Sequence, residues 1–156
     1  MRLIKLALIS IVFLFVVVTA ISLLIPSHIR ISKAINIYAE KDSIFQLISD
    51  TTKWSQWHPA FIPNDSARKF PAIHIVQKSQ NDSEVVMHLQ QAGKPEVING
   101  WTVYKHSSTD SLTLQWYMDF HLKWYPWKKF GSLFYENTYG VIMQEGLDNI
   151  KRLTEE

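Results

Sequence analysis

The chain has 156 residues, enough for one domain with a packed core and one additional segment. It contains no cysteine, which excludes a disulfide framework, a thiolate nucleophile and a cysteine-ligated metal. Lysine and arginine total 16 against 14 acidic residues, but Arg2 and Lys5 precede the first apolar segment, and without them the two signs balance. A domain without a basic excess is unsuited to neutralising phosphates, so we expect no nucleic-acid partner.

An apolar run of 20 residues without a charge occupies positions 6–25. At about 1.5 Å per residue it reaches about 30 Å, the thickness of a bilayer's hydrocarbon core. It predicts a transmembrane anchor over residues 1–27 and one domain over residues 28–156. A buried core helix and a cleavable signal peptide are the alternatives, but the run lacks a polar stripe and exceeds the usual signal-peptide length. The short basic tail favours a single-pass membrane protein with its domain on the periplasmic, extracytoplasmic side.

The segments after the anchor begin with a strand and two short helices. Apolar residues alternate with polar ones over residues 28–39, which predicts a strand. Residues 44–50 have helical spacing. Trp54 and Trp57 are three residues apart and therefore share one face of the next helical turn.

Three further strands are predicted in the middle of the chain. A loop rich in Pro, Asn and Asp over residues 60–71 precedes them. The strands cover residues 72–79, 83–92 and 96–106 and are separated by turn-forming residues. Gly100, inside the third of these strands, is typical of a bulge.

The strongest strand pattern in the chain covers residues 111–124. Its odd positions are polar, and we expect Tyr117 and Asp119 to face solvent. Its even positions form one apolar face, which consists of Leu112, Leu114, Trp116, Met118, Phe120 and Leu122. A long helical pattern then runs to the C-terminus and is suited to covering the apolar face of an antiparallel sheet, giving a two-layer α+β domain.

Three stretches together resemble a known family. They are residues 31–50, the pattern Trp54-x-x-Trp57-x-Pro59, and Gly140 with residues 146–151. The chain resembles the START-like (SRPBCC) superfamily, in particular its polyketide cyclase/dehydrase and lipid transport branch, whose bacterial members often carry a hydrophobic anchor. The resemblance implies a helix-grip fold, a curved antiparallel sheet wrapped on a long C-terminal helix, here preceded by one transmembrane helix. Family members bind lipids, sterols or polyketides in an apolar cavity, and a few are cyclases.

We therefore expect a membrane-anchored domain that binds a lipid or another apolar small molecule between the sheet and the last helix. A module whose core is simply filled is the alternative for the same residues. The mouth of the pocket is predicted at Trp54, Trp57 and His58. The residues predicted to line the cavity are Met87, Leu89, Trp101, Trp116, Met118, Phe120 and Phe134.

The sequence contains no recognisable catalytic motif. It has no metal-ligand spacing such as H-E-x-x-H, no nucleophile elbow and no phosphate-binding loop, so we predict no catalytic residue, metal or cofactor. Of the histidines, His58 and His74 are the ones predicted to lie near the pocket mouth. An enzyme of the cyclase or hydratase type, in which one of them moves a proton, stays open as an alternative.

Residues 123–130, KWYPWKKF, combine three lysines with four aromatic residues. One interpretation is the first turn of the last helix, with Pro126 at its start and its tryptophans packed. The other is an interfacial segment, with aromatic rings at the bilayer boundary, lysines on phosphates and a portal for lipid beside it. The expected partners are thus the bilayer and an apolar small molecule, and the sequence gives no oligomeric state.

Overall fold

A computed structural model describes residues 2–62, 73–91, 93–106 and 110–155. The chain begins with the apolar helix α1, followed by a strand and short helices. These are α1 (Arg2–Leu23), β1 (His28–Ile37), α2 (Lys41–Ser49), a 3-10 turn (Thr51–Lys53) and α3 (Trp54–Trp57). Four strands follow, β2 (Ile73–Gln80), β3 (Glu84–Gln91), β4 (Val97–Lys105) and β5 (Leu112–His121). The chain ends in α4 (Pro126–Ser132), a π-helical turn (Glu136–Gly140) and α5 (Val141–Glu155).

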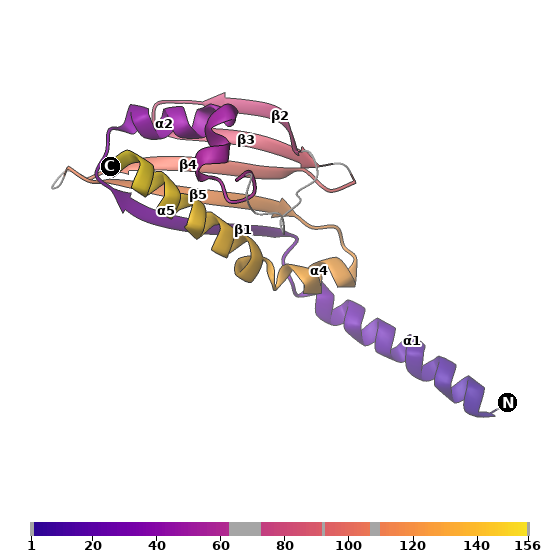
Figure 1. Cartoon of the computed structure of the whole chain (residues 1–156). Helices are drawn as coiled ribbons and strands as arrows, with labels where there is room; N and C mark the ends of the chain where they lie inside the picture. The colour runs from indigo at the N-terminus through magenta and orange to yellow at the C-terminus, as the bar shows by residue number, and fades with distance from the viewer. Residues whose placement is uncertain (1, 63–72, 92, 107–109, 156) are drawn as a thin grey trace.

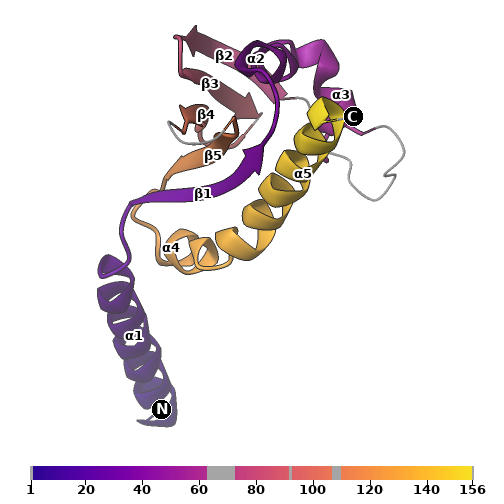
Figure 2. The ribbon, with the colours of Figure 1, turned by 90° about the vertical axis from the view of Figure 1, so that its left-hand side faces the viewer.

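The described strands form one antiparallel sheet in the order β1-β5-β4-β3-β2. The helix α5 crosses one face of this curved sheet, and α2 with α3 lies on the same face (Figures 1 and 2). The predicted α+β architecture is thereby confirmed, with the last helix held by a bent sheet in the helix-grip arrangement. The strand β5, whose apolar face is the longest in the sequence, is an internal strand between β1 and β4.

The core lies between the sheet and α5. The strands β1, β3, β4 and β5 contribute alternate residues to it, because successive side chains of a strand point to opposite faces, whereas no described side chain of the edge strand β2 is buried. The helix α5 contributes Met143, Leu147 and Ile150, which recur at helical spacing and are fully buried. The fully buried sheet residues include Val85, Met87, Trp101 and Leu114.

A cluster of tryptophans joins α3 to the sheet and to α5. The helix α3 buries both Trp54 and Trp57, as their spacing predicts. The Trp57 ring lies 6.3 Å from the ring of Trp101 and 5.7 Å from that of Trp116. Its Nε1 donates to the carbonyl oxygen of Leu47 at 3.0 Å, so a large apolar ring is buried without an unpaired donor.

The outer face of the sheet corrects one prediction. Tyr117 and Asp119 are on the outer face as expected, but both are buried there. Arg30 on β1 donates to the Asp119 carboxylate from Nε at 2.7 Å and from Nη2 at 2.6 Å, and its guanidinium lies 4.2 Å from the centre of the Tyr117 ring. The hydrogen bonds from Arg30 hold the pKa of Asp119 below its usual range. Burial, assisted by the acceptor Glu84, raises the pKa of Tyr117 to about 12, so its hydroxyl stays protonated.

Gly100 is not at a bulge, which corrects a second prediction. The pairing of β4 with β3 and β5 runs in unbroken register through Gly100, and the register shift lies instead between Ile75 and Gln77 of the edge strand β2. Gly100 pairs with Tyr117, and a Cβ atom at Gly100 would lie 2.0 Å from Cζ of the Tyr117 ring. The glycine is required because this ring covers the backbone of β4.

We therefore expect Gly100→Ala to lower the free energy of unfolding by about 1–3 kcal/mol, the usual cost of forcing a packed side chain aside. Displacing the Tyr117 ring also breaks its contacts with Arg30 and Glu84. Urea unfolding monitored by circular dichroism measures the change. Gly131→Ala is the matched control, since no described atom other than its chain neighbours and its own helix backbone lies within 4 Å of its Cβ position, and α4 gains from alanine. Equal stability of the two variants would contradict the close contact between Tyr117 and Gly100.

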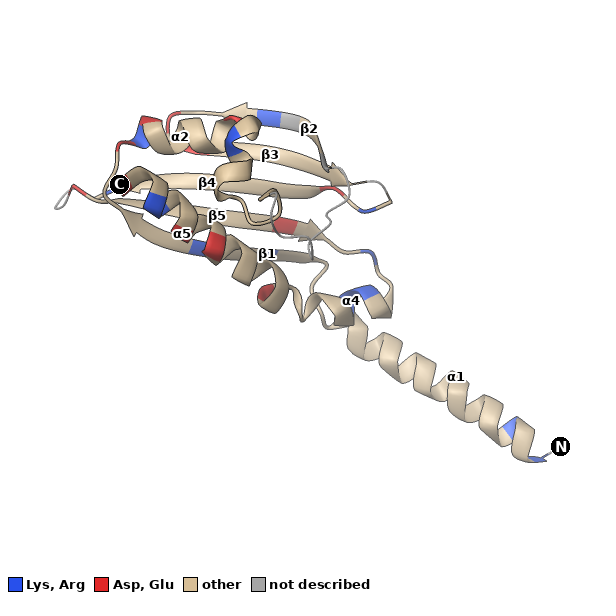
Figure 3. Cartoon of the chain, in the orientation of Figure 1, with Lys and Arg blue, Asp and Glu red and all other residues tan. Residues whose placement is uncertain are grey.

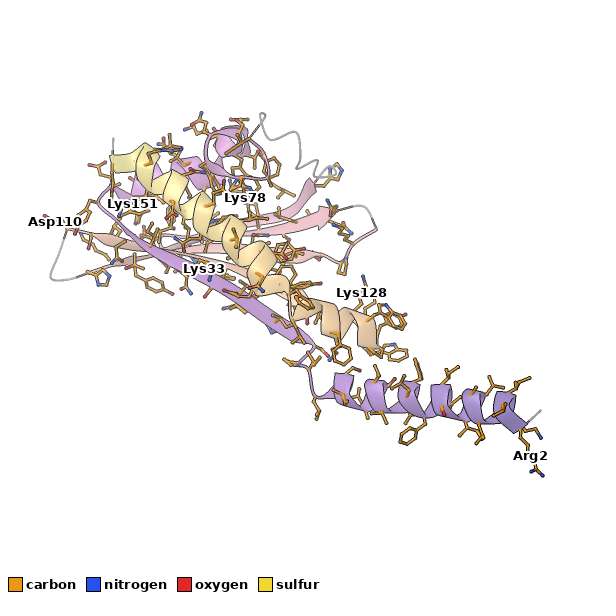
Figure 4. All side chains as sticks on the ribbon, turned by 60° about the horizontal axis from the view of Figure 1, so that its bottom comes forward. Arg2, Lys33, Lys78, Asp110, Lys128 and Lys151 are labelled. Atoms are coloured by element: carbon orange, nitrogen blue, oxygen red, sulfur yellow. The ribbon has the colours of Figure 1, made fainter. Side chains whose placement is uncertain are left out.

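The C-terminal helical pattern is interrupted, although the sequence predicts one long helix. The interruption is a turn at Leu133 and Phe134, and the π-helical turn that follows it continues directly into α5, so α4 and α5 are separate helices (Figure 2). Gly140 ends this turn against β1, where its Cβ position lies 3.0 Å from Cε of Lys33. Lys33, which Figure 4 labels on β1, forms an ion pair with Glu136 across the same contact.

Candidate functional site

A cavity of about 130 Å³ lies between the sheet and α5, at the end nearest α4. Its wall is mainly apolar, with contributions from β3, β4, β5, the loop after α3 and the first turns of the C-terminal helix. The lining residues are His58, Ala60, Phe61, Leu89, Gln90, Gln91, Lys94, Pro95, Val97, Asn99, Trp116, Met118, Tyr139 and Ile142. The strand residues reach the same space because the inward positions of β3, β4 and β5 lie side by side.

The structure distributes the predicted lining residues over three places. Leu89, Trp116 and Met118 line the cavity. Met87 and Trp101 are fully buried in the core and do not line it. Phe120 packs on the rings of Tyr135 and Tyr139 at 4.9 and 4.8 Å and lines a neighbouring groove.

Three predicted positions are wrong. Phe134 is 66% exposed, because the break between α4 and α5 turns it away from the sheet. Trp54 and Trp57 do not form the pocket mouth, because α3 packs both against the core, with 2% and 0% of their surface exposed. Of the three residues predicted at the mouth, His58 reaches the cavity.

His58 is held in one protonation state by its surroundings. Its ring lies among Trp54, Phe61 and Trp116, with ring centres 5.4, 5.0 and 5.2 Å away. Burial without a nearby carboxylate lowers the pKa of His58 to about 4, so the ring is neutral at pH 7. The backbone N–H of Ala60 donates to Nδ1 at 3.1 Å, and an accepting Nδ1 leaves the proton on Nε2.

This pKa predicts how stability depends on pH. Between pH 6.5 and pH 4 the unfolded chain protonates His58 while the folded chain does not, so the folded state is fully stable above pH 6.5 and loses stability as pH falls. For this residue alone we expect a loss of about 2 kcal/mol between pH 7 and pH 5. Urea titrations of the wild type and His58→Phe at both pH values measure it. If the two proteins lose the same stability on acidification, His58 is not buried as a neutral ring.

The other candidate for proton transfer lies outside the cavity. His74 is exposed on β2, beside a shallow hollow formed with Thr51, Trp54, Phe61 and Ile75. The structure does not bring it together with His58 in the cavity, and no Asp or Glu is among the described lining residues. Within the described ranges, no group of three or more His, Asp and Glu side chains could hold a metal ion.

Asn99 is a site residue that the sequence reasoning missed. It faces inward from β4 between Val97 and Trp101, is 1% exposed and lines the cavity. Its Oδ1 accepts from Nε1 of Trp116 at 3.1 Å, while its Nδ2 has no hydrogen-bond partner among the described residues. The signal was a lone amide at an inward position of a strand, which Ile98 and Tyr104 on the opposite face obscured.

A larger groove of about 440 Å³ adjoins the cavity and leads to α4. Lys94, Pro95, Val97 and Tyr139 line both spaces. Burial raises the pKa of the shared Tyr139, which therefore carries no charge. The far wall of the groove includes Tyr125, Trp127 and Lys128 of the segment KWYPWKKF. The cavity thus opens toward the part of the domain nearest to α1.

The helix α4 is fixed to the end of α1. Its Lys129 is 4% exposed and donates from Nζ to the carbonyl oxygen of Ile25 and to Oγ of Ser27. Lys129 is therefore unavailable to a lipid phosphate, in contrast to the interpretation of residues 123–130 as three lysines on headgroups. Lys128 points away from α4 (Figure 4). The basic residues of this segment are the blue parts of the ribbon at and just before α4 in Figure 3.

The helix α1 projects away from the rest of the chain (Figures 1 and 2). It is long and apolar enough to cross a membrane by its 22 residues and composition, and 6% of its most apolar window is buried. The core-helix alternative is therefore wrong for this segment, since the domain does not cover it. Length and composition alone do not distinguish an anchor from a signal sequence.

Comparisons with known proteins show the fold. No protein-family model and no curated protein matches the sequence. The di-domain ARO/CYC StfQ from the steffimycin biosynthetic pathway is similar to 82% of this chain over 51% of its own length, with a TM-score of 0.65 and 10% identity. A START superfamily protein from Mycobacterium smegmatis matches with a TM-score of 0.54 and 16% identity, over 81% of this chain and 97% of the other.

Norcoclaurine synthase from Thalictrum is similar over 81% of this chain and 93% of its own, with a TM-score of 0.57 and 13% identity. At identities this low, structural similarity shows a shared fold but does not show that the activity of one protein is present in the other. The chain therefore has the START-like helix-grip fold.

Proposed function

We propose that this chain is a membrane-anchored START-like domain that binds an apolar small molecule or part of a lipid, without covalent chemistry. The observation that carries the proposal is the apolar cavity between the sheet and α5, which shares part of its lining with a groove toward α4. A neutral, deeply buried His58 and a described lining without a carboxylate favour binding over proton transfer. The polyketide ARO/CYC proteins among the similar structures support an apolar, ring-containing ligand.

The size of the cavity limits what it encloses. At about 130 Å³ it is close to the roughly 150 Å³ of an engineered protein cavity that holds benzene, and below the roughly 300–1,000 Å³ of pockets for drug-sized ligands. It therefore accepts one ring or a short chain, and the rest of a longer molecule lies in the groove. Burying apolar surface at about 25 cal/mol per Å² supplies the affinity.

Mass spectrometry of molecules that co-purify with the full chain in lipid nanodiscs tests this proposal. We expect a small set of apolar molecules that is enriched over empty nanodiscs and absent from Ile142→Trp, in which an indole fills the cavity. Equal amounts in both proteins would contradict ligand binding in this cavity.

The same proposal places α1 across the bilayer and the domain on the extracytoplasmic side, with α4 at the membrane surface. The contact of Lys129 with Ile25 and Ser27 supports this placement, because it fixes α4 beside the end of the apolar helix. Trp124 and Trp127 are 61% and 62% exposed, which is unusual for tryptophan in water but common at the headgroup boundary. Lys123 and Lys128 next to them suit anionic lipid phosphates.

The depth of α4 can be measured with a spin label, because the chain has no cysteine of its own. We expect a label at Trp127→Cys, in the full chain in nanodiscs, to collide with oxygen more often and with a water-soluble nickel complex less often than a label at Tyr104→Cys. Tyr104 is the control because it is exposed at the end of β4 remote from α1. Equal access of the nickel complex to both labels would show that α4 does not contact lipid.

A further inference from the structure

The cavity carries a polar pattern that specifies its ligand more closely than size and hydrophobicity do. We propose that it selects molecules with an uncharged carbonyl oxygen, which accepts hydrogen bonds from Nδ2 of Asn99 and Nε2 of His58. This inference rests on the proposed function, since it names the ligand class of the same cavity. It follows from two hydrogen-bond assignments that the neighbours of these side chains determine.

The first assignment concerns Asn99. An indole nitrogen can only donate, so the atom of Asn99 that lies 3.1 Å from Nε1 of Trp116 must be the carbonyl oxygen. The NH2 group is then the remaining arm of the amide, and it has no partner within the described part of the chain. A buried amide without a partner is costly, and a ligand oxygen that reaches this NH2 group from the cavity would recover the lost hydrogen bond.

The second assignment concerns His58. A backbone N–H also can only donate, so Nδ1, which receives the N–H of Ala60, is an acceptor and Nε2 carries the ring proton. None of the hydrogen bonds among the described residues uses this proton. The His58 ring lies 5.2 Å from the ring of Trp116, the same side chain that orients Asn99, and all three residues line the cavity.

Two donors and an apolar wall define the complementary ligand. It presents an acceptor oxygen to Asn99 and His58 and an apolar ring or chain to Leu89, Met118 and Ile142. A carboxylate fits poorly, because Lys94 is the one charged residue of the described lining and its side chain is exposed. A buried anion without a cation is costly, whereas a ketone, ester or amide oxygen needs only the two donors.

A matched pair of probes tests the carbonyl. Cyclohexanone and methylenecyclohexane have the same shape, and the second replaces the oxygen with a CH2 group. Dissociation constants are measured by NMR with the full chain in nanodiscs, and free probe concentrations by headspace gas chromatography. We expect the preference for cyclohexanone over methylenecyclohexane to fall about three- to tenfold in Asn99→Leu and in His58→Phe, the value of one hydrogen bond. Asn36→Leu, the same change at an exposed position on β1, should leave the preference unchanged.

A second readout needs no variant and covers the case in which Asn99→Leu does not fold. The infrared stretch of carbon-13-labelled cyclohexanone bound to the wild type should lie below its value in cyclohexane solvent, because hydrogen bonds weaken the carbonyl bond. Cyclobutanecarboxylate, of the same size but charged, should bind at least about tenfold more weakly at pH 7.

An unshifted carbonyl stretch, a preference unchanged in both variants, or carboxylate binding as tight as that of the ketone would overturn the inference while the proposed function stands. Absence of saturable binding of both uncharged probes would count against the proposed function itself.

Discussion

Replacing Trp57 with alanine is expected to lower the free energy of unfolding by about 3–5 kcal/mol, a large fraction of the stability of a domain this size. Trp57 is fully buried, and its ring contacts those of Trp54, Trp101 and Trp116. Its carbonyl oxygen accepts from Nδ2 of Asn149 at 3.0 Å, which connects the α3 region to α5. Removing the ring leaves a cavity where the layers meet.

Trp124→Ala is the matched control, because the same side chain is removed from a position that is 61% exposed. Its unfolding free energy should stay within about 0.5 kcal/mol of the wild type, as for most surface substitutions. Urea unfolding of both variants in the same detergent gives the comparison. If Trp57→Ala cost no more than Trp124→Ala, the tryptophan cluster would not be the centre of the core.

Replacing Ile142 with tryptophan is expected to abolish ligand binding while the domain stays folded. Ile142 is on the first turn of α5 and lines the cavity. An indole exceeds an isoleucine side chain by several heavy atoms, a large share of a space of about 130 Å³. Because the side chain grows into open space, the penalty of overpacking should be small, and affinity for a ligand that fills the cavity should fall at least a hundredfold.

Val141→Trp adds the same side chain one residue earlier, at a position that is 58% exposed. It should bind apolar probes as the wild type does, and both variants should unfold at similar urea concentrations. Unaltered binding by Ile142→Trp would show that ligands occupy another site, such as the groove along α4 alone.

Regular alternation made the sheet predictable from the sequence. The apolar face of residues 111–124 indicated β5, and the limits of β3 and β4 differ from those predicted by one residue at each end. Two tryptophans three residues apart were enough to place α3. Such patterns predict helices and strands correctly because an element that buries one face has apolar residues at a regular spacing in its sequence.

The errors arose where a residue's environment depends on segments remote in sequence. The alternation put Asp119 on the outer face correctly, but it carries no information on Arg30, which comes from β1 and covers it. Gly100 looked like a bulge because the Tyr117 ring that needs the space belongs to another strand.

The exposed position of Phe134 and the buried position of Lys129 have a common cause. Apolar residues continue at helical spacing through residues 133–142, so the sequence predicts an uninterrupted helix. The break at Leu133 and Phe134 lies between two long-range contacts, that of Lys129 with the end of α1 and that of the π-helical turn with Lys33 of β1. Neither contact is visible in a local pattern.

Fluorine NMR of the full chain labelled with 5-fluorotryptophan, titrated with cyclohexanone in nanodiscs, tests the existence of the ligand cavity most directly. Trp116 lines the cavity, whereas Trp127 lies on the far wall of the adjoining groove and Trp124 is exposed. The account predicts a saturable shift of the Trp116 resonance that is lost in Ile142→Trp, with little change at Trp124 and Trp127. Shifts of equal size at all three resonances, or a Trp116 resonance that does not move, would contradict it.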